Sequence, residues 1–172
     1  VVGLKAIARR EGSTLFMVLH AAFAVLLHRI TGQQQIVIGT PHAGRGEHAL
    51  DDVVGMFVNS VPLHTLVRPE GSPRDLLRLV HTDDLNDLAH AEVPFEAIVG
   101  RVLGRPSGSH NPIFQVMFSF QNFTIPELDL ADLRIVGRDP DEVAAQVDLQ
   151  LTLRADIDVA GNVEGRFTYA AD

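Results

Sequence analysis

The chain has 172 residues, of which 46% are hydrophobic and 21% are charged, so it can bury one ordinary core and is not a disordered polymer. Its formal net charge of −8 opposes attraction to nucleic-acid phosphates or to anionic lipid, and we expect neither nucleic acid nor a membrane as a partner. The absence of cysteine excludes disulfides, thiolate catalysis and zinc–thiolate sites, and it fits a cytoplasmic protein.

The start of the chain carries no basic stretch followed by an apolar run. We therefore expect no signal peptide, and a beginning at Val1 rather than Met leads us to expect a piece of a longer polypeptide. The longest apolar stretch, Leu15 to Leu27, is shorter than the roughly 20 residues of a membrane-spanning helix. It predicts a buried helix instead.

Two helices are predicted at the start. Residues 2–10 have the composition of a helix that ends at Gly12. Ser13 is the predicted N-cap of a second helix over residues 14–31, and Gly32 is its predicted stop. Apolar side chains surround this second helix on nearly every side, which indicates burial on most faces.

Two strands and two more helices follow. The β-branched run at 35–39 predicts a buried strand, and residues 57–67 predict another, in which Pro62 indicates an edge or a bulge. A helix is expected from Pro73, which suits a first helical position, towards His90. A shorter helix is expected over 94–102.

The last third of the chain reads as strands. The predicted strands cover residues 113–120, 133–136, 146–156 and 162–169, and the turn between the last two is centred on Gly161. Helices come first and an antiparallel hairpin comes last. We therefore predict an α/β fold, a layered α+β sandwich with a mixed sheet of about six strands and helices packed on it, in one domain over residues 1–172.

Four short segments carry a resemblance to a known family. They read Ile38-Gly39-Thr40-Pro41-His42-Ala43-Gly44-Arg45, Gly55-Met56-Phe57-Val58-Asn59-Ser60, His90-Ala91-Glu92-Val93-Pro94-Phe95-Glu96 and Asn111-Pro112-Ile113-Phe114-Gln115-Val116-Met117-Phe118. In this order they resemble the signatures of condensation domains of nonribosomal peptide synthetases. The family usually has an aliphatic residue in place of His42 and Gln-Asp in place of Ala91-Glu92. We call these stretches the first to fourth motif segments.

The resemblance implies a chloramphenicol-acetyltransferase-like fold in which two lobes enclose a tunnel. Carrier proteins bring donor and acceptor substrates into it on phosphopantetheine arms, and the acceptor amine attacks the donor thioester to form an amide. The family's catalytic His-His-x-x-x-Asp-Gly motif belongs to the N-terminal lobe, and no two of the eight histidines here are adjacent. We therefore expect a C-terminal lobe that is inactive alone and has no directly bound cofactor. Its expected partners are its N-terminal lobe, donor and acceptor carrier proteins and an adenylation domain.

Other functions remain open at this point. Epimerization domains and non-catalytic recruitment domains share the architecture, and an intact catalytic motif in the upstream lobe would favour catalysis over both. A free-standing interaction domain that binds through an exposed sheet edge is a third possibility.

The resemblance places Asn59, Thr40 and Ser60 near the substrate tunnel. Asn59 is the main candidate because a side-chain amide can donate and accept hydrogen bonds near a thioester, and the alternative is an amide that ties two loops together. No catalytic residue is expected in this chain. The other motif residues are expected to be structural: Gly39, Pro41, Arg45, Gly55, Phe57, His90, Pro94, Phe95, Glu96, Asn111, Pro112 and Gln115.

Several competing site chemistries have weaker support. Arg45 could lock its loop through a bidentate pair with a carboxylate. His90 and Glu96 could form an acid–base pair, but Glu96 suits the first turn of a helix better. The loop with His42 and His48 has metal-capable side chains but no known ligand spacing, so we expect no metal site.

Overall fold

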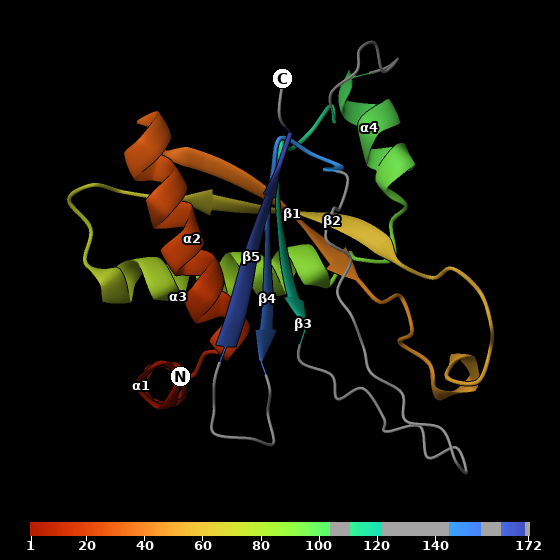
Figure 1. Cartoon of the computed structure of the whole chain (residues 1–172), viewed down its shortest axis with the longest axis horizontal. Coiled ribbons are helices and arrows are strands. Elements are labelled where there is room, and N and C mark those ends of the chain that lie inside the picture. The colour runs from red at the N-terminus through yellow and green to blue at the C-terminus, as the bar shows by residue number, and fades with distance from the viewer. Residues whose placement is uncertain (104–110, 122–144, 156–162, 171–172) are drawn as a thin grey trace, which may run out of the picture.

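The computed structural model describes residues 1–103, 111–121, 145–155 and 163–170 (Figure 1). In these ranges the helices and strands follow the predicted order. The elements are α1 (Val2–Arg10), α2 (Leu15–Thr31), β1 (Gln35–His42), the 3₁₀ turn η1 (His48–Leu50), β2 (Asn59–Leu66), α3 (Pro73–Leu88), α4 (Phe95–Leu103), β3 (Val116–Gln121), β4 (Leu149–Ala155) and β5 (Val163–Tyr169).

The described strands form one mixed sheet in the order β2-β1-β3-β4-β5. β1, β3 and β4 run parallel, while β2 and β5 pair antiparallel at the two edges. The edge position predicted from Pro62 is thus confirmed, as is the final hairpin. The sheet has five strands in the described ranges, and the expected strand over 133–136 lies outside the described residues.

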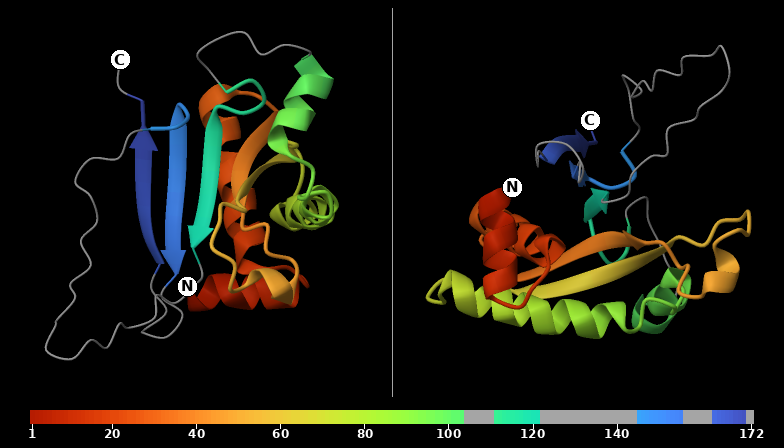
Figure 2. Two further views of the ribbon diagram at one scale, coloured as in Figure 1. Left: turned by 90° about the vertical axis from the view of Figure 1, so that its right-hand side faces the viewer. Right: turned by 90° about the horizontal axis from the view of Figure 1, so that it is seen from below.

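The core lies between the sheet and the helices on one of its faces. Ile38 of β1 stands opposite Leu63 of β2, and both side chains are fully buried on that face. Phe118 of β3 and Phe23 of α2 continue this core towards β4, with ring centroids 6.0 Å apart. Figure 2 shows α2 and α3 lying against the sheet, with α4 at one end of it. The layered α/β class is confirmed by this arrangement.

The N-cap of α2 differs from the prediction by one residue. The Thr14 hydroxyl accepts a hydrogen bond from the Met17 backbone N–H at 3.2 Å, and Thr14 has the extended backbone of a cap. Ser13 instead donates its hydroxyl to the Met17 sulfur at 3.4 Å. Gly32 ends the helix as predicted, with a φ of 72° that suits glycine.

An ion pair ties the end of α1 to the start of α3. The Arg74 guanidinium donates to both Glu11 carboxylate oxygens, at 2.7 and 2.8 Å. Hydrogen bonding from Arg74, and then from Arg10, lowers the pKa of Glu11 from its ordinary 4.5 to about 2. Glu11 is therefore charged throughout the neutral range and holds α1 against α3.

The outer edge of β2 is covered by a side chain of α3. The Asp87 carboxylate accepts a hydrogen bond from the His64 backbone N–H at 3.1 Å. Two residues earlier, Pro62 has no N–H to offer on the same edge. Of two successive outward-facing residues on this edge, His64 therefore has its N–H already bonded and Pro62 has no N–H.

No single helix in the described ranges is long and apolar enough to cross a membrane. The pair formed by α1 and α2 satisfies the same criteria only when taken together, and its two halves meet at a bend of 101°.

The cap assignment gives a direct test. We expect Thr14→Ala to lower the free energy of unfolding by about 1 kcal/mol, because the first turn of α2 loses its side-chain acceptor. Ser13→Ala, the matched control, should change it by less than about 0.5 kcal/mol. Urea unfolding followed by circular dichroism measures both. Equal losses in the two variants would contradict the assignment.

Candidate functional site

The four motif segments meet at one end of the sheet, where β1 ends, β2 begins and α4 starts. Each segment contacts the next, so that they form a closed ring. This region lies on the right-hand side of Figure 1, beneath α4 and beside the loop that carries η1.

The first and fourth segments are in contact through Gly39. A β-carbon at this position would overlap the ring of Phe114, so only glycine allows the approach. Gly39 also pairs with Met117 across β1 and β3. One residue on, the buried Thr40 hydroxyl donates to the Phe118 carbonyl oxygen at 2.9 Å. These contacts hold the end of β1 against the fourth segment.

The first and second segments are in contact through Gly44 and Arg45. Gly44 has a φ of 66°, and the carbonyl oxygen of Phe57 occupies the place of a β-carbon. The Arg45 guanidinium lies 4.5 Å from the centroid of the Phe57 ring. It also donates to the backbone carbonyls of Leu50 and, at 2.9 Å, Val53. Arg45 therefore holds its loop, as the structural alternative expected, but through carbonyl oxygens and a ring face and not through the carboxylate that was considered.

Asn59 joins the second segment to the third. Its side-chain amide donates to the carbonyl oxygens of Ala91 at 2.8 Å and Val93 at 2.7 Å. Its side-chain oxygen accepts from the Phe95 backbone N–H at 3.1 Å. Both amide hydrogens are thus bonded to backbone. This matches the alternative weighed for Asn59, an amide that ties two loops together, and leaves one oxygen lone pair for any other partner.

Phe95 closes the ring by packing on Phe114, with ring centroids 5.3 Å apart. Phe114 is held by a turn in which the Asn111 side-chain oxygen accepts from the backbone N–H groups of Ile113 and Phe114, both at 3.1 Å. Gln115 donates its side-chain amide back to the Asn111 carbonyl at 3.0 Å. This turn explains why β3 begins at Val116 and not at the predicted Ile113.

A small hollow of about 250 Å³ lies beside the Asn59 contacts and is lined by Ser60, Asp87 and His90, among others. His90 donates its Nδ1–H to the Asn86 carbonyl at 2.8 Å. Glu96 lies in the first turn of α4, as expected. In the described part of the chain no hydrogen bond or ion pair joins His90 to Glu96. Pro41, Gly55, Pro94 and Pro112 are exposed beside the ring.

The histidines of the loop around η1 make local contacts. His42 accepts from the Gly44 N–H at 3.2 Å, and the exposed His48 pairs with Asp51 at 2.7 Å. Within the described ranges no three histidine or acidic side chains come close enough to hold a metal ion.

Comparison with known proteins identifies the family. The family model described as Condensation domain matches residues 2–171. The chain belongs to the condensation-domain family.

Condensation-domain relatives cover almost the whole chain. It is 36% identical to one of the linear gramicidin synthase proteins of Brevibacillus parabrevis over 176 residues, which cover 100% of this chain and 2% of that protein. It is 37% identical to one of the plipastatin synthase proteins of Bacillus subtilis (strain 168), covering 98% of this chain and 5% of that protein. The chain thus spans only a small part of the curated relatives it matches.

Solved structures show the same fold. A holo four-domain nonribosomal peptide synthetase bound to AMP and glycine superposes with a TM-score of 0.81 at 27% identity, over 98% of this chain and 14% of that one. The X-domain from teicoplanin biosynthesis superposes with a TM-score of 0.86 at 24% identity, over 98% of this chain and 39% of that one.

One buried pair in this condensation-domain chain was not found from the sequence. His20 of α2 and Asp84 of α3 are fully buried, and the His20 Nδ1 lies 3.0 and 3.1 Å from the two Asp84 oxygens. The available signal was Asp84 itself, which shares a helix face with Leu77 and Val80, where an apolar residue is expected. Its partner lies 64 positions away, so no local spacing could reveal it.

The Asn59 contacts predict a stability effect. Asn59→Ala should lower the free energy of unfolding by about 2 kcal/mol, because two carbonyls and one N–H lose their partner. Asn59→Asp should cost more, since it places a carboxylate against the Ala91 and Val93 carbonyl oxygens. Ser60→Ala, one position on, is the control and should stay within about 0.5 kcal/mol. Urea unfolding gives all three values, and an Asn59→Asp protein as stable as the parent would refute the description.

The His20–Asp84 pair predicts strong coupling. Asp84→Ala should lower the free energy of unfolding by about 3 kcal/mol or more, because it leaves a buried imidazole N–H without its acceptor. Replacing both residues by leucine should recover most of that loss, since no polar partner is then left buried. A double-mutant cycle of His20→Leu, Asp84→Leu and the double variant, measured by urea unfolding, tests this coupling, and additive losses would contradict it.

Proposed function

We propose that residues 1–172 form the C-terminal lobe of a nonribosomal peptide synthetase condensation domain that joins a carrier-bound aminoacyl or peptidyl thioester donor to a carrier-bound amino acid acceptor. The acceptor amine attacks the thioester carbonyl, a C–N bond forms, the C–S bond breaks and the donor carrier's thiol is released. The single observation that carries this proposal is the Asn59 bonding, because it joins the second and third motif segments into one structural unit.

The lobe's part in the reaction is to shape one wall of the tunnel. Thr40 and Asn59 commit their polar groups to backbone partners, so we assign them to holding that wall in place. Ser60 lines the neighbouring hollow, and its hydroxyl has no hydrogen-bond partner within the described residues. Ser60 is therefore the residue of the three best placed to face substrate.

A second role is contact with the N-terminal lobe. The loop before β2 exposes four large apolar side chains, and Arg45 fixes this loop through the Leu50 and Val53 carbonyls. An exposed apolar loop that is held rigid is typical of a surface that another protein part covers. The exposed side chains are Val53, Val54, Met56 and Val58.

The general base is assigned to the N-terminal lobe, so this lobe alone is inactive. The sequence has no His-His-x-x-x-Asp-Gly motif, and His20, the only fully buried histidine in the described ranges, is paired with Asp84. No cofactor is bound directly in this proposal, and substrates arrive on phosphopantetheine arms. The setting is the cytoplasm, with two carrier proteins and an adenylation domain as neighbours.

A recruitment role without condensation is the second candidate. The X-domain from teicoplanin biosynthesis, solved in complex with OxyB, superposes with a TM-score of 0.78 at 23% identity over 95% of this chain. That likeness in fold supports a role in which this lobe binds a partner protein and takes no part in amide formation.

The decisive experiment is a condensation assay with donor and acceptor loaded on carrier proteins. The chain is assayed alone and together with a separately expressed N-terminal lobe of the same domain. We expect amide product only in the mixture, because the base and the tunnel wall come from different lobes.

The controls separate chemistry from assembly. Size-exclusion chromatography of the mixture shows whether the two lobes associate. A mixture in which both adjacent histidines of the added lobe's His-His-x-x-x-Asp-Gly motif are replaced should give no product. Product from the chain alone would contradict the inactive-lobe proposal. An associated mixture without product would favour recruitment over condensation.

A further inference from the structure

A groove between helices lies far from the motif ring. It runs between α2 and α3, is also lined by residues 67–69 and 71–72 and by Ile7 of α1, and has a volume of about 520 Å³. Its floor is apolar, with Val18, Ala21 and Val25 from α2 facing Leu76 from α3. This volume is in the range of sites that take several apolar groups.

Two arginines stand at the rim of this apolar floor. Arg29 ends α2 and Arg68 follows β2, both are exposed, and both line the groove. Neither guanidinium has an ion pair or hydrogen bond with any described residue, in contrast to Arg74, which is bound to Glu11. Two cationic groups are thus available beside an apolar surface.

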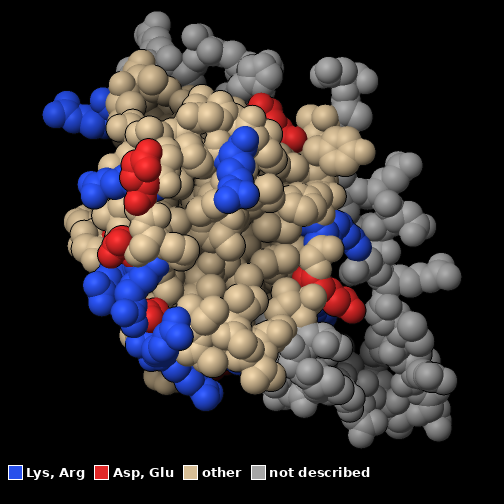
Figure 3. Space-filling model, turned by 90° about the vertical axis from the view of Figure 1, so that its left-hand side faces the viewer, with Lys and Arg blue, Asp and Glu red and all other residues tan. Residues whose placement is uncertain are grey.

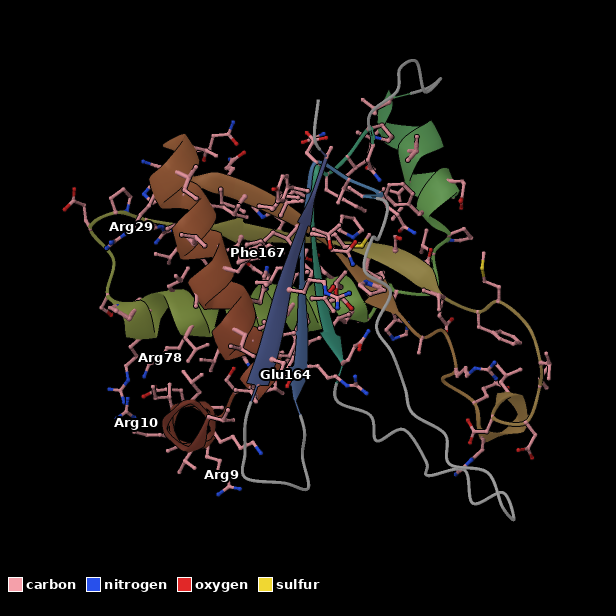
Figure 4. All side chains as sticks on the ribbon, in the orientation of Figure 1. Arg9, Arg10, Arg29, Arg78, Glu164 and Phe167 are labelled. Atoms are coloured by element: carbon pink, nitrogen blue, oxygen red, sulfur yellow. The ribbon has the colours of Figure 1, made fainter. Side chains whose placement is uncertain are left out.

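The part of the sequence that supplies the groove has a net positive charge although the chain is acidic. Residues 1–80 contain eight Lys and Arg residues and six Asp and Glu residues, a net of +2 in a chain of net −8. Figure 3 shows Lys and Arg side chains, with Asp and Glu side chains among them, around a wide uncharged area on this face. Figure 4 shows Arg29, Arg78 and Arg10 extending from α2, α3 and α1 on the same side. The charge and the apolar floor are therefore found together.

We propose that this groove docks an acidic amphipathic segment of a protein partner. Apolar side chains of the segment enter between α2 and α3, and its carboxylates pair with Arg29 and Arg68. Nucleic acid would leave the apolar floor uncovered, and an apolar segment without acids would leave the two guanidiniums unpaired. An acidic amphipathic segment covers the apolar floor and also pairs with both guanidiniums.

The length of the groove fits a helical segment. Val18 and Arg29 are separated by eleven positions on α2, which corresponds to about 16 Å. Apolar anchors at positions i, i+4 and i+7 of a helix span about 10 Å, so three anchors fit, with acidic residues at the end of the segment that lies beside Arg29 and Arg68. This inference does not depend on the proposed condensation reaction.

The test uses a defined probe. A fluorescein-labelled peptide of about 14 residues, with leucine at i, i+4 and i+7 and glutamate at the flanking positions, is titrated with the chain and followed by fluorescence anisotropy. A second peptide has lysine in place of every glutamate. We expect the acidic peptide to bind at least about ten-fold more tightly, with a difference that shrinks as salt is raised.

Variants distinguish the groove from net charge. R29E/R68E should weaken binding of the acidic peptide by about ten-fold or more and should strengthen binding of the lysine peptide. The matched control R101E/R154E makes the same change of charge on residues outside the groove and should alter binding by less than about two-fold. Ala22→Trp, at an exposed position that lines the groove, should block binding without a change of charge. Circular dichroism confirms that each variant is folded.

Three outcomes would overturn the proposal. Equal loss in R29E/R68E and R101E/R154E would mean that only net charge attracts the peptide. Unchanged binding in Ala22→Trp would mean that the apolar floor is not used. Binding to phosphatidylserine vesicles with no binding to either peptide would assign the surface to a lipid headgroup.

Discussion

The side-chain amide of Asn59 is the interaction on which the motif ring depends. It holds three backbone groups of a segment 32 to 36 residues further along the chain. Through that segment it sets where α4 begins and brings Phe95 onto Phe114. Phe114 in turn fills the space beside Gly39, which explains the glycine at the end of β1. A polar side chain thus positions an aromatic contact that the sheet itself could not specify.

The sequence predicted the elements well because their signals are local. Gly32 and Pro73 mark helix ends by their own backbone preferences, and Pro62 marks an edge because it lacks an N–H. The α2 cap was placed one residue early because Ser13 and Thr14 are both good caps and only geometry separates them.

The side-chain partners could not be predicted in the same way. A carboxylate was considered as the partner of Arg45 because a guanidinium often binds one through two parallel hydrogen bonds, but the folded loop turns carbonyl oxygens towards Arg45. His20 and Asp84 lie 64 residues apart, and only the packing of α2 on α3 brings them together. The motif resemblance located the Asn59 region, whereas the groove beside Arg29 has no motif at all.

The covered edge of β2 has a consequence for how copies of the chain can meet. A second strand needs a continuous row of backbone donors, and on β2 that row is broken where Asp87 occupies the His64 N–H and Pro62 has none. β5 is the other border of the described sheet. If two copies paired through their β5 strands, the β2 edge of each copy would face outward. Edge-to-edge pairing into a fibre needs two open borders on every copy, and the β2 edge opposes it.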